Sequence, residues 1–206
     1  CSSSTTSAVT PSGGVPVLLT RDGDGVVRGF LNACRHRGAP VVEACGAAAR
    51  NFACPFHAWT YALDGRLLGR PRSEGGFDSI GRDDHGLVPI PVVEAHGVVL
   101  MRPEGNEPID AARELCGLEA DLENFDISSY AVFGRMRREW QANWKLVLDT
   151  FMESYHVFAL HGASVGPDYP GHVMVFDAFG PHMRIPVPRA SLLALSDAPR
   201  ESWDLL

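Results

Sequence analysis

The chain has 206 residues, of which 45% are hydrophobic and 21% charged, so it can bury one sizeable core or two modest ones. Its formal net charge is -7 and no stretch is rich in Lys and Arg, which argues against a nucleic-acid partner. No apolar run approaches the roughly 18–20 residues that cross a bilayer, and the Ser/Thr-rich start lacks the apolar core of a signal peptide. We therefore expect a soluble, cytoplasmic protein with neither membrane nor nucleic acid as a partner.

The first half of the chain is predicted to be rich in short β-strands. Residues 1–14 form a low-complexity lead of Ser, Thr and Gly that we expect to be disordered. Residues 15–20 and 26–32 have strand character, and the turn residues at 21–25 (RDGDG) predict a hairpin between them. Further short strands are expected at residues 51–54, 58–62, 66–68, 87–93 and 97–101. Short strands with frequent turns predict a small sandwich or barrel over residues 15–102.

The pattern changes near residues 102–108, where we place a domain boundary. Apolar residues at helical spacing predict a helix over residues 108–122, behind a Pro suited to a first helical turn. A strand at residues 135–140 should lead into a long helix over residues 141–161, and another strand is expected at residues 172–178. Residues 103–206 should therefore form a second, α+β domain.

The strongest motif of the chain is a pair of mixed Cys/His sequences, C-x-H-x17-C-x2-H, formed by Cys34, His36, Cys54 and His57. A Rieske [2Fe-2S] cluster needs two thiolates on one iron and two imidazoles on the other, supplied as one Cys/His pair from each of two loops. A Cys2His2 zinc site uses the same ligand types but usually opens with C-x2-4-C and closes with H-x3-5-H. The mixed halves favour the cluster. The remaining cysteines are best explained as reduced thiols, because five scattered cysteines do not suggest a disulfide framework.

The sequences around these ligands carry a family resemblance. The runs CRHRG (34–38) and CPFHAW (54–59), followed by Tyr61, Asp64 and Gly65, resemble the Rieske domain of ring-hydroxylating oxygenases over residues 15 to about 102. Respiratory Rieske proteins have an extra Cys in each cluster loop, where this chain has Ala39 and Phe56. The oxygenase branch is therefore favoured.

A second motif lies in the long predicted helix. Asp149, Glu153 and His156 follow one another at i, i+4 and i+7 and should share one stripe. His161 would lie about 140° from His156 on an ideal helix, so joint metal binding requires the helix to end, bend or bulge between them. The residues alone leave open a helix with a buried carboxylate and two unrelated histidines.

The segment NWK (143–145) with E-x2-H-x4-H is similar to the mononuclear-iron segment of Rieske oxygenase α subunits. The resemblance implies that His156 and His161 bind a non-haem Fe(II), completed by a carboxylate. It also places Glu153 where the family has an acid that links a Rieske histidine of one subunit to an iron-ligand histidine of its neighbour. Many members have Asp there, so the longer Glu leaves that geometry open. Asp149 is the second acid that we assign to this catalytic site.

The third iron ligand of the family normally lies far downstream. The acids available after His161 do not match that placement, and none is assigned: Asp168, Asp177, Asp197, Glu201 and Asp204. The family's leading helical segment before the Rieske strands is also missing. We therefore expect a chain truncated at both ends.

The resemblance implies an α+β architecture in which an all-β Rieske sandwich precedes part of a helix-grip (START-like) catalytic domain. It further implies a terminal oxygenase, a monooxygenase or dioxygenase, that takes electrons from an NAD(P)H-dependent reductase or ferredoxin and delivers them through the cluster to Fe(II) and O2. We expect hydroxylation or demethylation of a small organic substrate, with aromatic hydrocarbon catabolism favoured, in a homotrimer with or without a β subunit. The substrate stays open among aromatic acids, arenes and quaternary amines.

Two functional questions remain open at the level of sequence. The alternative to an oxygenase is a Rieske electron-transfer protein whose second domain is structural or serves docking. We also hypothesise that Arg35 and Arg37 hold the acidic surface of an electron donor, although ordinary solvated arginines explain the sequence equally well.

Overall fold

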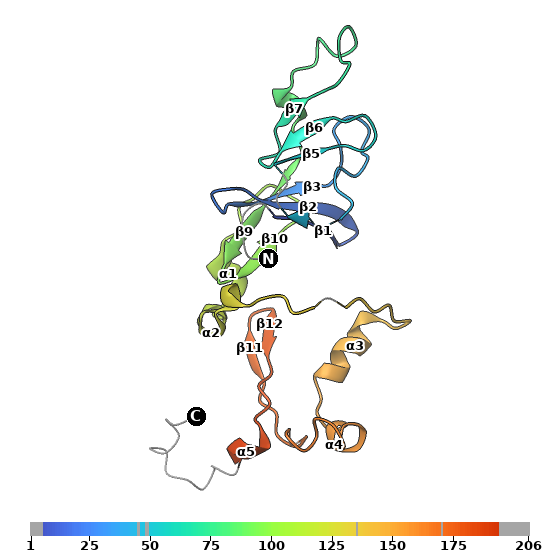
Figure 1. Ribbon diagram of the computed structural model, residues 1–206. Coiled ribbons are helices and arrows are strands. Elements are labelled where there is room, and N and C mark those ends of the chain that lie inside the picture. The colour runs from blue at the N-terminus through green and yellow to red at the C-terminus, as the bar shows by residue number, and fades with distance from the viewer. Residues whose placement is uncertain (1–5, 45, 48–49, 135, 170, 194–206) are drawn as a thin grey trace. The chain divides into compact units, whose positions relative to one another are not determined.

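The computed structural model describes residues 6–44, 46–47, 50–134, 136–169 and 171–193. The chain divides into two compact units, Cys1–Phe133 and Gly134–Leu206. Figure 1 labels most strands of the first unit and the helices of the second. No helix in the described ranges is both long and apolar enough to span a membrane.

Antiparallel sheets make up most of the first unit (Figure 1). A five-stranded sheet has the order β4-β1-β2-β3-β8, and a three-stranded sheet has the order β5-β6-β7. The strands of the first are β1 (Thr6–Ser12), β2 (Val15–Arg21), β3 (Val27–Leu31), β4 (Gly46–Ala47) and β8 (Pro89–Ile90). Those of the second are β5 (Asn51–Ala53), β6 (Thr60–Ala62) and β7 (Leu67–Gly69), and a further hairpin joins β9 (Val92–Ala95) to β10 (Val98–Met101).

Strand β1 corrects one prediction, and the hairpin after β2 confirms another. β1 pairs antiparallel with β2 across a turn at Gly13 and Gly14, both at positive φ, so the expected disordered lead is wrong for Thr6–Ser12. Residues 1–5 of that lead lie outside the described residues. The predicted hairpin between β2 and β3 forms, because the Asp22 carboxylate accepts hydrogen bonds from two backbone N–H groups of the turn.

One hydrophobic core joins the five-stranded and three-stranded sheets. Leu18 and Phe30 enter it from the first sheet, and Phe52 and Tyr61 enter it from the second. The same core also includes Cys34, Val41, Cys54, Trp59, Leu67 and Leu87. Burying a large apolar side chain contributes about 1.5–3 kcal/mol, so the segments that bear the Cys/His motif belong to the best-packed part of the described chain.

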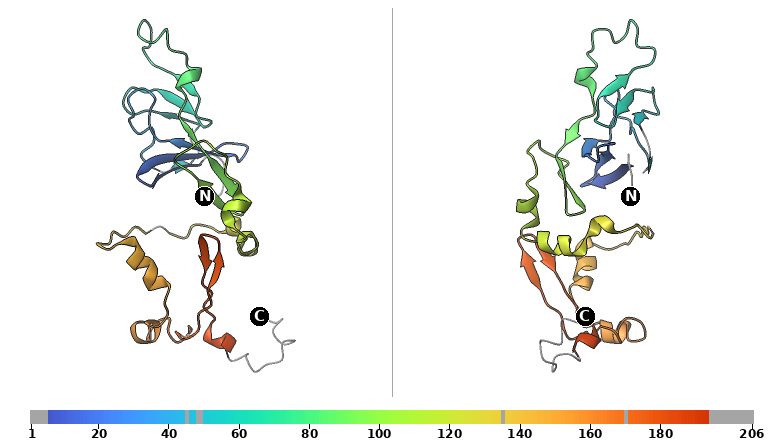
Figure 2. Two further views of the ribbon diagram at one scale, coloured as in Figure 1. Left: turned by 180° about the vertical axis from the view of Figure 1, so that it is seen from behind. Right: turned by 60° about the vertical axis from the view of Figure 1, so that its left-hand side comes forward.

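The first unit extends past the predicted domain boundary. The predicted helix over residues 108–122 is two short helices, α1 (Ala111–Leu115) and α2 (Glu119–Phe125), interrupted where Cys116 and Gly117 take positive φ. α1 packs against β9, and Figure 2 shows the green β9–β10 hairpin leading into these helices. An ion pair of 2.9 Å between Arg102 and Glu114 fastens α1 to the end of β10. The first compact unit therefore continues beyond residues 102–108 to Phe133.

The second unit has short elements joined by long loops. It contains α3 (Trp144–Phe151), α4 (Val157–Leu160), the hairpin of β11 (Asp177–Phe179) with β12 (His182–Arg184), and α5 (Ala190–Leu193). The strand predicted at residues 135–140 does not form over residues 136–140, and residue 135 lies outside the described residues. The expectation of an α+β fold, with a sheet-rich part followed by a mixed part, is confirmed.

Candidate metal centres

The first candidate centre consists of two loops, residues 34–39 and 54–59, that have the same pattern of main-chain hydrogen bonds. In each loop the cysteine N–H donates to the carbonyl of the sixth residue, and the cysteine carbonyl accepts from the N–H of the fifth residue, all at 2.8 Å. The fifth residues, Gly38 and Ala58, both take left-handed conformations with φ of 73° and 56°. The two loops thus present their cysteines from matching tight turns.

The donors from these loops lie together. Cys34 and Cys54 are both free and each only 3% exposed, and the rings of His36 and His57 lie 4.6 Å apart between centroids. Each loop supplies one thiol and one imidazole. A zinc site needs four donors around one point, whereas a Rieske cluster takes two donors on each of two irons. The donor set therefore fits the cluster.

The two histidines have different surroundings. His36 is partly buried: it stacks on Trp59 at 5.1 Å with the rings 8° from parallel, and Phe77 meets it edge-on at 5.7 Å. Burial lowers the pKa of His36, and the neighbouring His57 lowers it further. The neutral imidazole that a metal requires is therefore favoured. His57 is exposed.

Tyr61 is a member of this site to which the sequence assigned no role. The side chain is fully buried in β6, and its hydroxyl accepts a 3.0 Å hydrogen bond from the Arg35 N–H. The hydroxyl also lies 3.2 Å from Cys34 Sγ, to which it can donate its own proton. Burial, and then the contact with Cys34, raises the pKa of Tyr61 well above its usual value, so the phenol keeps its proton.

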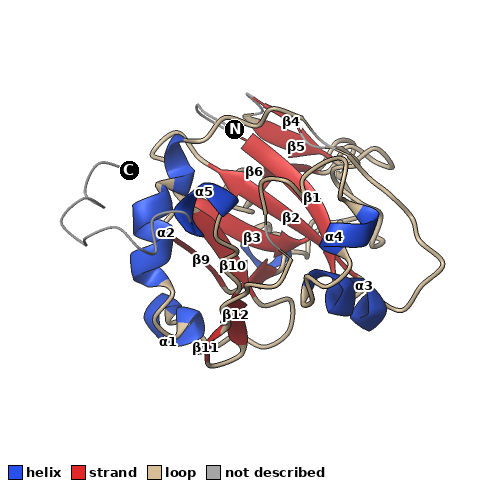
Figure 3. Cartoon of the chain, turned by 90° about the horizontal axis from the view of Figure 1, so that it is seen from below, coloured by secondary structure: helices blue, strands red, loops and turns tan. Residues whose placement is uncertain are grey.

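The second candidate centre shows that the single long helix predicted over residues 141–161 is wrong. The chain forms α3, a turn over residues 152–156, and the one-turn helix α4, which Figure 3 shows as separate helices. Asn143 caps α3 by accepting from the Lys145 N–H. The helix stops because the Glu153 carboxylate accepts from the N–H groups of Tyr155 and His156, at 2.6 and 3.3 Å.

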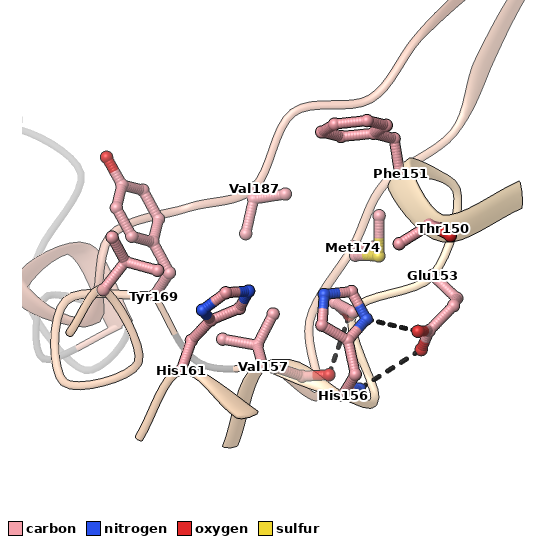
Figure 4. A pocket seen from close by; sticks show the side chains of 12 residues that line it. Thr150, Phe151, Glu153, His156, Val157, His161, Tyr169, Met174 and Val187 are labelled. Carbon is pink, nitrogen blue, oxygen red and sulfur yellow. Dashed lines mark hydrogen bonds and ion pairs between the residues drawn. The ribbon is translucent and has the colours of Figure 1, made fainter. Parts of the chain in front are cut away.

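This break brings the two predicted histidines together. His156 precedes α4 and His161 follows it, and their ring centroids lie 5.5 Å apart. The Glu153 carboxylate also contacts Nδ1 of His156, as the dashed lines in Figure 4 show. That hydrogen bond lowers the pKa of Glu153, so the carboxylate is ionised and holds the imidazole proton on Nδ1. Nε2 of His156 is then left for a metal.

A cavity of about 650 Å³ opens beside this pair (Figure 4). Its lining is largely apolar and consists of Thr150, Phe151, Glu153, Ser154, His156, Val157, His161, Val165, Tyr169, Gly171, Met174 and Val187. The structure thus groups Glu153 with both histidines. Asp149 is exposed on α3 and does not line the cavity. Of the acids left unassigned, Asp177 pairs with Arg184 at 2.7 Å, and Asp197, Glu201 and Asp204 lie outside the described residues.

Two protein families match the two parts of the chain that contain the candidate centres. The Rieske [2Fe-2S] domain family matches residues 4–116, and the ring hydroxylating alpha subunit (catalytic domain) family matches residues 127–204. The chain belongs to the Rieske oxygenase alpha subunits. The resemblance seen in the sequence is confirmed, and membership implies two cofactors, a Rieske [2Fe-2S] cluster and a mononuclear non-haem iron.

Individual Rieske oxygenases resemble the chain over most of its length. It is 37% identical over 148 residues to the glycine betaine monooxygenase oxygenase subunit of Pseudomonas aeruginosa, covering 71% of this chain and 33% of that protein. It is 30% identical over 167 residues to the carnitine monooxygenase oxygenase subunit of Acinetobacter baumannii, covering 77% and 40%. A solved quaternary ammonium Rieske monooxygenase, described for carnitine oxidation and inter-subunit electron transfer, matches with a TM-score of 0.76 at 26% identity over 85% of this chain and 48% of that one. The chain spans between a third and two fifths of the length of the two curated relatives.

Proposed function

We propose that this chain belongs to the terminal oxygenase of a multicomponent Rieske system, which uses O2 and electrons from an NAD(P)H-dependent reductase or ferredoxin to hydroxylate a small organic substrate. The observation that carries the proposal is the presence of both donor sets in one chain. The buried cysteines accompany paired imidazoles in the first unit, and His156 and His161 flank α4 beside a cavity in the second. An electron carrier needs only the first set.

The proposed ligand assignment follows the donor chemistry. Cys34 and Cys54 bind one iron of the cluster, and His36 and His57 bind the other. His156 and His161 bind the Fe(II), with a carboxylate as the third protein ligand. Once bound, the two centres supply one-electron storage and reductive activation of O2.

The protein's own contribution at the second centre is orientation. Glu153 fixes the tautomer of His156 through Nδ1 and fixes the turn that carries it through two backbone N–H groups. We also propose that Glu153 connects His156 with the cluster histidine of a neighbouring subunit in a trimer. This role is supported by the contact of the Glu153 carboxylate with His156 (Figure 4) and by the inter-subunit transfer described for the related monooxygenase.

For the substrate we propose an N-methyl quaternary ammonium compound. The two curated relatives described above act on glycine betaine and carnitine, and the cavity lining suits a cation. It includes the aromatic rings of Phe151 and Tyr169 and the carboxylate of Glu153, and no Lys or Arg is among the described residues that line it. Aromatic faces attract quaternary ammonium groups by about 0.5–2 kcal/mol each. One oxygen atom would enter an N-methyl C–H bond, and the other would leave as water with two electrons from the reductase and two protons. The C–N bond of the hydroxymethyl group would then break, releasing formaldehyde, a proton and the tertiary amine, which keeps the electron pair of that bond.

The oxygenase proposal is tested by iron content and O2 uptake of the full-length protein. We expect about three irons per chain and substrate-dependent O2 uptake when a reductase and NAD(P)H are supplied. About two irons per chain with no O2 uptake would instead identify an electron-transfer protein.

The substrate class is tested by comparing matched compounds. Glycine betaine and carnitine should stimulate O2 uptake and formaldehyde release. 3,3-Dimethylbutyrate, in which a neutral tert-butyl group replaces the trimethylammonium group of glycine betaine, should not stimulate O2 uptake, and benzoate tests the aromatic alternative. Equal uptake with the isostere, or greater uptake with benzoate, would refute the cationic substrate and leave the oxygenase proposal standing.

A further inference from the structure

A half-buried arginine lies one aromatic ring away from His36. Arg70 follows β7, and its guanidinium carbon lies 5.8 Å from the ring centroids of both Trp59 and Phe77. Trp59 in turn stacks on His36, and Phe77 meets the same imidazole edge-on. The two rings therefore contact the cation and the candidate ligand at once.

The side chain is fixed in this place. Arg70 donates a 2.9 Å hydrogen bond to the Ile80 carbonyl, which ties the end of β7 to the loop that carries Phe77. A guanidinium held on ring faces is pre-organised, because little rotamer freedom remains to be lost. The charge of Arg70 therefore has a defined position relative to the rings.

The charge of Arg70 is poorly neutralised. Its Nε is buried and has no hydrogen-bond partner, and among the residues that the structure describes no carboxylate forms an ion pair with it. Arg21, by comparison, forms a two-pronged pair with Glu94 at 2.5 and 2.7 Å. The cluster-loop arginines Arg35 and Arg37 are exposed to solvent, which weakens their charges, although the charge of Arg37 still lowers the pKa of His36. Among these cations, Arg70 combines partial burial with an uncompensated charge.

We infer that Arg70 raises the reduction potential of the cluster. The inference rests on the proposed ligand assignment. On reduction, one electron passes from a flavin or iron–sulfur donor to the cluster, which then carries one more negative charge. A fixed positive charge in a poorly polarisable surrounding favours that state over the oxidised one. Arg70 thereby makes electron transfer from the donor more favourable without touching the iron ligands.

The test is an equilibrium redox titration of full-length holoprotein, followed by the visible absorption of the cluster. Arg70→Gln removes the charge and keeps an N–H donor for the Ile80 carbonyl. We expect about a tenfold fall in the equilibrium constant for reduction, which is about 59 mV for one electron. Arg70→Lys keeps the charge and should stay within about twofold of the wild type. The matched control is Arg82→Gln, at an exposed arginine whose guanidinium donates to the Leu68 carbonyl at 3.4 Å, and it should leave the potential unchanged.

The outcomes separate charge from structure. An unchanged potential in Arg70→Gln, or an equal fall in Arg70→Lys, would overturn the inference, and so would a shift that vanishes at high ionic strength. If Arg70→Gln assembles no cluster, Arg70→Met supplies the neutral state. Loss of the cluster from both neutral variants, with Arg70→Lys intact, would assign Arg70 a structural role and also overturn the inference. A wild-type holoprotein without a Rieske spectrum would refute the ligand assignment instead.

Discussion

The cysteine loops of the first unit lie inside a hydrophobic core, whereas the histidine pair of the second unit lies on a turn between two short helices. Cys34 and Cys54 are each 3% exposed and are members of the core cluster. In contrast, α3 leaves Trp144 and Phe151 exposed by 67% and 75%. The first site is therefore held by the packing of the fold, and the second is held locally, chiefly by Glu153. Substitutions should affect stability and cofactor together at the first site, and cofactor alone at the second.

The largest effect is expected at the core site. Cys34→Ala should abolish cluster absorption and acid-labile sulfide and should also lower the unfolding temperature, because cluster binding and folding are coupled. Absorption spectroscopy, sulfide analysis and thermal unfolding measure these effects. Cys116→Ala, at an exposed free cysteine, is the control and should change none of them. A Cys34→Ala protein with a normal Rieske spectrum would remove Cys34 from the ligand set.

At the second site, His156→Ala should separate the two cofactors. We expect loss of the mononuclear iron and of turnover, with cluster absorption and unfolding temperature retained, because His156 is not part of the core. Iron analysis and O2 uptake provide the measurements. His172→Ala, at an exposed histidine that does not line the cavity, is the control. Retained turnover in His156→Ala would refute the iron assignment.

A smaller loss is expected when the positioning carboxylate is removed. Glu153→Ala should lower turnover by about 10–100-fold while both metals remain bound, since substitution of a partner of a metal ligand typically costs that much. Single-turnover electron transfer, followed at the cluster absorption, measures the effect. Glu139→Ala removes an exposed acid of the same unit and serves as the control. Normal rates in Glu153→Ala would exclude Glu153 from the electron route.

The hydrogen bond of Tyr61 should have a moderate effect on the cluster alone. Tyr61→Phe removes the donor to Cys34 Sγ and leaves the Arg35 N–H without its partner. A hydrogen bond worth about 1 kcal/mol corresponds to roughly 40 mV for one electron, so the potential should fall by about that amount. Redox titration of Tyr61→Phe measures this change, and Tyr130→Phe, at an exposed tyrosine, is the control and should leave the potential unchanged. A potential that stays the same would show that the hydroxyl does not interact with the ligand sulfur.

The smallest effect is expected in the loop backbones. Gly38→Ala should destabilise the holoprotein by about 1 kcal/mol, because its φ of 73° is unfavourable for a residue with a Cβ, although the added atom meets nothing within 4 Å. Ala58→Gly, at the matching position of the second loop, should stabilise it by somewhat less. Unfolding temperatures should therefore move in opposite directions. Shifts of the same sign would show that the two loops are not equivalent.

The four donors of the first candidate site could be proposed from the sequence because they are local. Cys34 with His36, and Cys54 with His57, each lie within one six-residue loop, so spacing alone constrains their geometry. The role of Tyr61 could not be predicted in this way. It depends on how β6 lies against a loop that is 26 positions away in sequence, which only the packing of the two sheets determines.

The histidines of the second candidate site could be proposed from the sequence, whereas the backbone that carries them was predicted wrongly. Apolar periodicity over residues 141–161 indicated one helix. Such periodicity gives no information about a side chain that accepts hydrogen bonds from backbone N–H groups and thereby ends a helix. Glu153 does so by accepting from Tyr155 and His156. The break removes Asp149 from the predicted stripe and brings His161 beside His156. The same limit explains β1, whose pairing follows from the turn at Gly13 and Gly14 and not from its low-complexity composition.

Main-chain hydrogen bonds hold the matching turns of residues 34–39 and 54–59 together. Those bonds require no particular side chain at the exposed positions 35, 37, 55 and 56, so the backbone of the two loops does not depend on the residues exposed there. Residues at these positions can be exchanged to suit a different redox partner while the frame that presents the ligands stays the same. The surface that contacts a redox partner can therefore change in sequence while the main-chain hydrogen bonds of the cluster loops stay the same.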